Sequence, residues 1–269
     1  MPNQTVGLEP DRRKELEENK KYIETEGLDK LVDFTENLDL KIGVFDNASG
    51  DLNVSYPPEA SDLVRLHKLI RKRKCFTVLE FGLGYSTLIM ADALSKNKKE
   101  WEALDPVPEV RNRFMFQIFS VDASAEWIDV VKKRVPSALA DRINISQSDV
   151  KIGTHNGQIC SFYEKLPDIV ADFIYLDAPH PKDVKGDING LSFKCDERTV
   201  MSGDLLLMEP TFLPGTLVLV DGRSNNARFL QRNFTRDYKI DWNKKEDVTT
   251  FELDEERLGY LNVLGSDFL

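Results

Sequence analysis

The chain of 269 residues is long enough to bury a substantial core, and its length predicts one large domain with an extension. Apolar residues make up 41% of it and charged residues 30%, which is the balance of a globular protein rather than a disordered one. The net charge of −10 argues against a general nucleic-acid binder, because such proteins present a basic surface to phosphate groups.

Membrane and disulfide-rich classes are disfavoured as well. The chain has no run of about 18 apolar residues that could span a bilayer, and residues 1–21 are polar where a secretory signal would be apolar. Three widely spaced cysteines, Cys75, Cys160 and Cys195, indicate neither a disulfide framework nor a zinc cluster. We therefore expect a cytoplasmic protein with no membrane partner and no nucleic-acid partner.

The first part of the chain is predicted to be a helical extension. Residues 11–37 favour two helices separated at Gly27, a residue that suits a helix C-cap. The first of these helices is so polar that it needs a partner surface. Turn formers over 47–58 mark a boundary. We expect residues 1–60 to cap the core, cover the active site or mediate homodimerisation, and residues 61–269 to form the main domain.

From residue 61 onward, segments with helical and strand periodicity alternate. Helices are predicted from Ser61, with His67 on the apolar face, and over 86–94, 125–135 and 226–233. Strands are predicted over 77–81, 115–121, 143–146, 172–176, 216–220, 238–242 and 248–253. This alternation predicts an α/β fold with a doubly wound, mostly parallel seven-stranded sheet. Only residues 243–247 join the last two strands, which is too short for a parallel crossover, so these strands must form an antiparallel hairpin.

The segment 77–87 combines a buried strand, a tight turn and the start of a helix. Gly82 and Gly84 allow the backbone to turn sharply and to approach a ligand closely. The helix that begins near Ser86 offers free backbone N–H groups to a carboxylate or a phosphate. In an open parallel sheet, ligands bind beyond the carboxyl ends of the strands. The segment therefore predicts a pocket of nucleoside size.

Acidic residues lie beneath the turn and at two further strand ends. Glu80 can reach the ammonium group of a ligand, directly or through water, and Asp122 can accept hydrogen bonds from ribose hydroxyls. Asp149 follows the third strand and can accept from an adenine amino group. A dinucleotide site would need a third glycine where Thr87 stands, and Glu80 would repel pyrophosphate. A zwitterionic amino acid tolerates the acid at position 80.

This order of residues resembles the class I S-adenosylmethionine-dependent methyltransferases, and the resemblance covers about residues 61–269. The positions that match the cofactor site of the family are Glu80, Gly82, Gly84, Asp122 and Asp149. The resemblance adds further residues to the predicted cofactor site: Phe81, Ser86, Thr87, Ala123 and Asp177. Two features depart from the family, since Ser86 replaces its third glycine and the connection over 95–114 is unusually long. The alternative is a generic α/β protein with ordinary turn glycines and solvated acids.

Residues 177–181 follow the fourth strand, where this fold carries out transfer chemistry. They lack the Asn/Asp-Pro-Pro-aromatic signature of methylases that act on nucleobase amines. Methyl transfer to a hydroxyl requires removal of its proton, and we predict Asp177 and His180 as catalytic residues, with His180 as a general base that titrates near neutrality. In the alternative interpretation, His180 lies between two prolines and only shapes the loop.

A divalent metal is the alternative catalytic device. Asp177 and Asp221 end adjacent predicted strands, and their carboxylate oxygens suit Mg²⁺. This arrangement resembles the catechol-type O-methyltransferases, in which the second acid is followed by another acid or an asparagine. Here Gly222 follows Asp221, which departs from that pattern.

A polar cluster after the fifth strand is the predicted acceptor site. Arg223, Asn225 and Asn226 can hold a hydroxylated or anionic substrate, because the planar fork of arginine matches a carboxylate or a phosphate. Alternatively, Ser224 or Asn225 caps the following helix and Arg223 pairs with a surface acid. The segment 181–203 is too long for a simple connection and is predicted to be a substrate lid.

Together these features predict a methyltransferase that uses S-adenosylmethionine to methylate a hydroxyl of a small molecule, such as a sugar or a similar metabolite. One alternative is an aminopropyl transferase, in which Asp177 and Asp221 would form an acidic diamine site. Another is a non-catalytic ligand-binding or scaffold protein that assembles through its N-terminal helices. The sequence does not indicate which acceptor is used.

Overall fold

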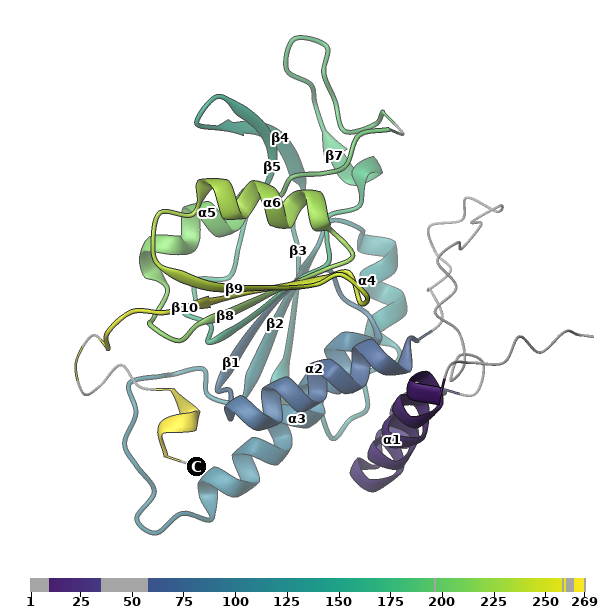
Figure 1. Cartoon of the computed structure of the whole chain (residues 1–269), viewed down its shortest axis with the longest axis vertical. Helices are drawn as coiled ribbons and strands as arrows, with labels where there is room; N and C mark the ends of the chain where they lie inside the picture. The colour runs from purple at the N-terminus through teal and green to yellow at the C-terminus, as the bar shows by residue number, and fades with distance from the viewer. Residues whose placement is uncertain (1–9, 35–57, 196, 258, 260–263, 269) are drawn as a thin grey trace, which may run out of the picture.

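A seven-stranded sheet lies at the centre of the computed structural model, which describes residues 10–34, 58–195, 197–257, 259 and 264–268 (Figure 1). Its strand order is β3-β2-β1-β6-β8-β10-β9. The strands are β1 (Thr77–Phe81), β2 (Gln117–Asp122), β3 (Ile143–Gln147), β6 (Phe173–Leu176), β8 (Leu217–Asp221), β9 (Tyr238–Asn243) and β10 (Val248–Leu253). Neighbours from β3 to β8 are parallel, and β10 is antiparallel to both β8 and β9. The predicted mostly parallel sheet with a terminal antiparallel hairpin is confirmed.

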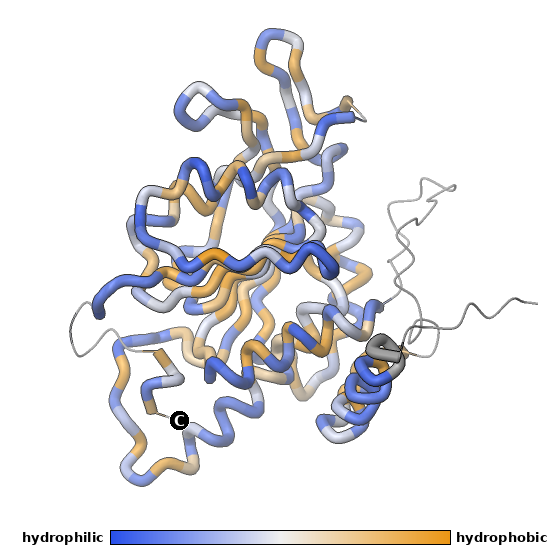
Figure 2. Tube along the Cα trace, viewed as in Figure 1, coloured by the Kyte–Doolittle hydropathy of each residue, from blue (hydrophilic) through white to orange (hydrophobic). Residues whose placement is uncertain are grey.

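Helices cover both faces of the sheet (Figures 1 and 2), so every residue of the central strands β1 and β6 is buried. The helices are α1 (Pro10–Glu26), α2 (Ala60–Arg73), α3 (Tyr85–Glu102), α4 (Ala125–Lys132), α5 (Asp204–Met208) and α6 (Ser224–Asn233). Alternate strand residues face opposite layers of the core. Val78 packs with Leu66 of α2 and Met90 of α3, whereas Leu79 belongs to the cluster that contains Phe229 of α6.

Helix boundaries differ from the prediction in all four predicted helices of the main domain, since α4 ends at Lys132 and α6 begins at Ser224. Helix α2 begins at Ala60 with Glu59 at the N-cap, one residue before the predicted start at Ser61. Helix α3 continues to Glu102, so much of the supposedly long connection over 95–114 is helical. The side chains that extend it are core residues, because Asn97 and Trp101 are buried against the start of β1.

The structure also contains a small second sheet that the sequence interpretation missed. It has the strand order β5-β4-β7, with β4 (Val150–His155), β5 (Gln158–Tyr163) and β7 (Val184–Lys185). The β4–β5 hairpin turns at Asn156 and Gly157, both of which have positive φ. Asn-Gly is the strongest short hairpin signal, and it was available in the sequence. His155 is the last residue of β4.

Helix α1 packs against α2, and His67 is at their contact (Figure 1). His67 is fully buried, with Nδ1 at 2.8 Å from the Tyr22 hydroxyl and Nε2 at 3.0 Å from Asp92. The chain then forms a short 3₁₀ helix at Leu28–Lys30 after Gly27, which has the left-handed conformation expected of a helix end. Residues 31–34 form a turn and irregular chain, so the predicted second helix is wrong beyond this single 3₁₀ turn, and the segment 35–57 lies outside the described residues. The assignment of residues 1–60 as a cap, lid or dimerisation element stays a prediction.

No helix within the described ranges is both long enough and apolar enough to cross a membrane.

Candidate functional site

A cavity of about 320 Å³ opens at the carboxyl edge of the sheet, beside the ends of β1, β6 and β8. Strand order reverses between β1 and β6, and this switch point is where doubly wound folds bind ligands. The described lining comes from the start of α2 (Pro58, Glu59, Asp62, Leu63), from residues 80–86, and from Trp127, Tyr175, Asp177, Asp221 and Gly222. The predicted glycine turn and three of the predicted acids, Glu80, Asp177 and Asp221, therefore share one cavity.

Glu80 is a buried carboxylate held by three hydroxyl groups. Ser86 donates a hydrogen bond of 2.5 Å to Oε1, while Thr87 and Ser120 donate to Oε2 at 2.7 and 2.6 Å. Burial raises its pKa to about 7, although the hydroxyl donors act in the opposite direction. Because hydroxyl groups can rotate to donate or accept, this shell accommodates both the ionised and the neutral form. A cationic group in the cavity would therefore favour the ionised form of Glu80.

Positions 82 and 84 of the turn are occupied by glycine for different structural reasons. Gly82 has φ of +98°, and a Cβ atom there would lie 3.2 Å from the Cβ of Ala178, so the position requires glycine. Gly84 is the N-cap of α3, and its N–H donates to the Thr87 hydroxyl at 3.0 Å. A Cβ at Gly84 would meet no protein atom within 4 Å. Glycine at position 84 thus keeps the helix N-terminus open to a ligand.

Asp122, Ala123 and Asp149 lie at the same edge of the sheet but stand outside the described cavity lining. Asp122 ends β2 and accepts a hydrogen bond of 2.8 Å from the Ser124 N–H, and burial raises its pKa to about 6. Asp149 follows β3 and pairs with Lys185 of β7 at 2.7 Å. Trp127 lines the cavity, and its indole N–H donates to the Leu83 carbonyl at 2.7 Å.

Asp177 and His180 have different surroundings although they are three residues apart. Asp177 follows β6 and lines the cavity, and 58% of its side-chain surface is exposed. Desolvation raises the pKa of Asp177 to about 7 against the lowering effect of the Arg223 charge, and the Asp221 and Glu80 carboxylates add smaller raising effects. His180 stands outside the described lining, and its Nδ1 accepts from the Lys182 N–H at 3.2 Å to cap a 3₁₀ helix at Pro181–Asp183. Partial burial lowers the pKa of His180.

Asp221 is bound by a tyrosine and an arginine that the sequence interpretation did not single out. The Tyr175 hydroxyl donates to Asp221 Oδ2 at 2.9 Å, and Arg65 Nη2 lies 3.5 Å from the same oxygen. Arg65 also contacts Asp62 at 2.6 Å and Glu246 at 3.3 Å. Because side chains alternate along a strand, the sequence already indicated that Tyr175 lies on the same face as Asp177. Nothing local could have linked Arg65 to a residue 156 positions away.

The donor set does not fit the magnesium ion that the catechol-type resemblance suggested. Asp177 and Asp221 line one cavity, but no group of three or more potential protein ligands occurs in the described part of the chain. A guanidinium group already lies against Asp221, and Gly222 contributes no side chain at the next position. A hard divalent cation prefers several oxygen ligands and no adjacent cation. The metal assignment to Asp177 and Asp221 stays a prediction that these contacts do not support.

The predicted acceptor residues after β8 anchor neighbouring loops instead. Arg223 Nη2 donates to the carbonyl groups of Asp177 at 2.7 Å and Pro179 at 3.1 Å. Asn225 donates to the Thr199 hydroxyl at 3.2 Å. Asn226 is 1% exposed and bonds through both ends of its amide to the backbone of Ser202. Because both ends of its amide are bonded to the protein, Asn226 is not available to a substrate. Arg223 is the N-cap of α6 and makes no capping hydrogen bond through its side chain. The substrate role of Arg223 and Asn225 stays a prediction.

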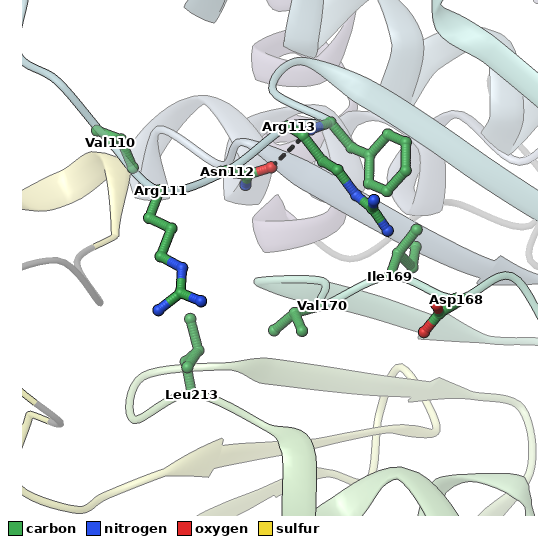
Figure 3. A pocket seen from close by; sticks show the side chains of 9 residues that line it. Val110, Arg111, Asn112, Arg113, Asp168, Ile169, Val170 and Leu213 are labelled. Atoms are coloured by element: carbon green, nitrogen blue, oxygen red, sulfur yellow. Dashed lines mark hydrogen bonds between the residues drawn. The ribbon is translucent and has the colours of Figure 1, made fainter.

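A larger cavity of about 610 Å³ lies at the opposite, amino edge of the sheet (Figure 3). Residues 110–114, 168–170 and Leu213, which precede β2, β6 and β8, form its described lining. Arg111 and Arg113 are both exposed, and the Arg113 guanidinium lies 4.8 Å from the centre of the Phe114 ring. None of the predicted site residues lines this cavity. Because transfer chemistry in this fold occurs at the carboxyl edge, we assign function to the smaller cavity.

Comparisons with known proteins give likenesses of structure only. No protein-family model and no curated sequence matches the chain. A methyltransferase of Podospora anserina bound to SAH (PaMTH1) is 12% identical, with 94% of this chain and 91% of that chain covered and a TM-score of 0.45. A putative caffeoyl-CoA O-methyltransferase from Staphylococcus aureus is 14% identical, with coverages of 88% and 99% and a TM-score of 0.45. An O-methyltransferase from Bacillus cereus in complex with SAH is 13% identical, with coverages of 94% and 94% and a TM-score of 0.37.

The order and directions of the strands identify the fold independently of these likenesses. A parallel sheet with its switch point between β1 and β6, closed by the antiparallel β10 between β8 and β9, is the fold of the class I S-adenosylmethionine-dependent methyltransferases. The expectation drawn from residues 77–87 and the terminal hairpin is confirmed at the level of the fold.

Proposed function

We propose that the protein is a methyltransferase that transfers the methyl group of S-adenosylmethionine to a hydroxyl of a small molecule. The observation that carries this proposal is the cavity in which Glu80, the glycine turn and Asp177 meet. In this proposal Glu80 compensates the ammonium group of the methionine moiety, and the turn at Gly82 and Gly84 lets the backbone approach it. Asp122, at the end of β2, accepts hydrogen bonds from the ribose hydroxyls. When bound, S-adenosylmethionine supplies an electrophilic methyl group on a sulfonium.

Asp177 is the general base in this mechanism. It lines the cavity, and its pKa of about 7 makes it a proton acceptor matched to neutral pH. It takes the proton of the acceptor hydroxyl as the oxygen attacks the methyl carbon in line with the departing sulfur. Arg223 holds the backbone of Asp177 and Pro179, which fixes the carboxylate relative to the acceptor. His180 remains the alternative base, and it is supported only by its position after β6.

Aminopropyl transfer is the second candidate function. Four carboxylates besides Glu80 line the same cavity: Glu59, Asp62, Asp177 and Asp221. Such a lining favours a cationic diamine as acceptor, because each ammonium group can be paired with a carboxylate. Parallel assays with a methyl donor and an aminopropyl donor discriminate between the two transfers.

Calorimetry with S-adenosylhomocysteine tests the cofactor step. We expect saturable binding by the wild type and its loss in Gly82→Arg, because that side chain would fill the turn. Leu207→Arg is the matched control, since Leu207 is 62% exposed on α5. Thermal unfolding of both variants separates lost binding from lost folding. Absence of binding by the wild type at millimolar ligand contradicts the proposal, while binding without turnover on any acceptor supports the scaffold alternative.

A further inference from the structure

Two arginines share the cavity of about 610 Å³ at the amino edge of the sheet (Figure 3). Both come from the segment 110–114, which precedes β2, and both are exposed. In Figure 3 the side chain of Arg111 extends toward Leu213 and that of Arg113 toward Ile169. Among the described residues, no carboxylate lies within ion-pair distance of either guanidinium group. One cavity therefore holds two positive charges that form no ion pair within the described structure.

The charge of this cavity is opposite to that of the cavity at the carboxyl edge. Its described lining has two arginines and a single carboxylate, Asp168, which lies across the cavity from Arg111 in Figure 3. The described lining of the carboxyl-edge cavity has five carboxylates and neither lysine nor arginine. The chain as a whole carries a net charge of −10. A basic concavity on an acidic protein attracts anions to that place and away from the carboxyl edge.

The segment that carries the arginines is fixed to the sheet by Asn112, which lies between them. Nδ2 of Asn112 donates a hydrogen bond of 3.0 Å to the hydroxyl of Thr77, and its Oδ1 accepts one of 2.9 Å from the Phe114 N–H. The Thr77 hydroxyl in turn donates to the Phe114 carbonyl at 3.1 Å. Thr77 is fully buried at the start of β1. The backbone on both sides of Asn112 is thus held in place, which lowers the entropic cost of binding a ligand there.

An aromatic ring and apolar side chains complete the cavity. The Arg113 guanidinium lies 4.8 Å from the centre of the Phe114 ring, and that ring packs edge-on against Phe119 at 5.1 Å. A guanidinium group that stacks on a ring keeps its charge and its in-plane N–H donors. The apolar lining consists of Ile169, Val170 and Leu213. An inorganic ion alone would leave this apolar lining in contact with water, whereas a ligand with an apolar part would cover it.

We infer that the amino-edge cavity is a second binding site, which takes a small organic anion by pairing its phosphate or carboxylate group with Arg111 and Arg113 and by placing its apolar part on the apolar lining. The planar forks of the two guanidinium groups match the oxygens of either anionic group. The volume of about 610 Å³ is typical of sites for small organic ligands. This inference goes beyond the proposed function, because the proposed cofactor and acceptor both bind at the opposite edge of the sheet.

Isothermal titration of the full chain with phenyl phosphate tests this inference. The ligand joins an anionic group to an apolar ring, whereas inorganic phosphate supplies the anion alone and phenol supplies the ring alone. We expect saturable binding of phenyl phosphate by the wild type, at least about tenfold tighter than that of either fragment. Benzoate is titrated in parallel, and the tighter of the two ligands identifies the preferred anionic group. Saturating S-adenosylhomocysteine should leave this affinity unchanged, because its proposed site is at the carboxyl edge.

Removal of either guanidinium group should weaken the binding. Arg111→Gln and Arg113→Gln should each lower the affinity by about tenfold or more, because each removes a charge-assisted contact. Val170→Asp should abolish binding by placing a carboxylate on the apolar lining, since Val170 is 45% exposed there. Arg228→Gln is the matched control, because Arg228 is also exposed and lies 5.3 Å from the centre of an aromatic ring, that of Trp242, outside the described lining.

Thermal unfolding checks that each variant is folded, and Arg111→Lys, which keeps the charge without the fork, replaces Arg111→Gln if that one is not. Absence of binding of both phenyl phosphate and benzoate by the wild type at millimolar ligand overturns the inference. Binding that is equally tight in the wild type and the two glutamine variants, binding that is lost in Arg228→Gln, or a fragment that binds as tightly as the whole ligand overturns it as well. These titrations need neither cofactor nor turnover, so their failure is distinct from failure of the proposed function, which the S-adenosylhomocysteine titration reports.

Discussion

The hydroxyl group of Ser120 on β2 donates a hydrogen bond of 2.6 Å to Oε2 of Glu80 on β1. The two residues are paired in the parallel register of these strands, so their side chains project from the same face of the sheet. This register lets a buried carboxylate receive a third hydroxyl donor besides those of Ser86 and Thr87. The cofactor side of the cavity is therefore prepared by strand pairing before any ligand enters.

Glu80 should make the stability of the ligand-free protein decrease with pH. Its pKa is raised from 4.5 to about 7, so the folded state holds a proton that the unfolded state has already released in this interval. The free energy of unfolding therefore falls as the pH rises from about 4.5 to about 7, and the contribution of Glu80 is lost above that range. Between pH 5 and pH 8 the wild type should lose up to about 3 kcal/mol more than Glu80→Gln.

Urea denaturation of both proteins at several pH values measures this difference. Other buried acids with raised pKa values, such as Asp172 and Asp204, act in the same direction but are common to both proteins. Parallel pH profiles for the wild type and Glu80→Gln would show that Glu80 does not hold its proton in the folded state.

The two glycines of the turn should respond differently to alanine. Gly82→Ala places a Cβ at φ of +98° and 3.2 Å from the Cβ of Ala178, so we expect a loss of stability of about 1–3 kcal/mol. Gly84→Ala meets no protein atom within 4 Å and should keep the stability of the wild type. Its methyl group would enter the space beside the helix N-terminus, so it should weaken S-adenosylhomocysteine binding. Thermal unfolding and calorimetry on this pair separate the two effects, and equal destabilisation by both would contradict the assignment.

Those features of the site that are local in sequence were predictable. A strand, a glycine turn and a helix start follow each other within residues 77–87, so Glu80, Gly82 and Gly84 needed no long-range information. The strand-end position of Asp177 was equally visible, because strand limits follow from apolar runs. These residues are the ones that the structure brings to one cavity.

What could not be predicted depends on contacts between distant segments. Arg65 stands on the helix that was interpreted through its apolar face alone, and its partners Asp221 and Glu246 come from the far end of the chain. The polar residues after β8 suggested a substrate site. The amide of Asn226 is hydrogen-bonded to the backbone of Ser202, and this contact cannot be deduced from sequence spacing. The β4–β5 hairpin is a different case, since Asn156 and Gly157 gave a local signal that was not used.

Tyr22 should stabilise the docking of α1 through a single hydroxyl group. Nε2 of the buried His67 bonds to Asp92, so its Nδ1 depends on the Tyr22 hydroxyl for a partner. Tyr22→Phe keeps the ring and its packing but leaves Nδ1 unpaired, which should lower the free energy of unfolding by about 1–3 kcal/mol. Lys14→Ala is the control on the same helix, because the exposed pair of Lys14 with Glu18 should contribute less than about 1 kcal/mol. Equal unfolding curves for the two variants would show that this hydrogen bond does not hold α1 in place.

The last prediction distinguishes Asp177 from His180 as the base. If Asp177 accepts the proton, kcat/KM should rise as the pH rises through about 7, because only the ionised carboxylate is active. Asp177→Asn should lower kcat/KM by about 10²–10⁴-fold and abolish this rise. His180→Ala should leave both the rate and the pH profile close to those of the wild type, since His180 caps a 3₁₀ helix outside the described cavity lining. Calorimetry with S-adenosylhomocysteine on each variant excludes loss of cofactor binding as the cause. The reverse pattern, a collapse in His180→Ala with turnover kept in Asp177→Asn, would assign the base to His180.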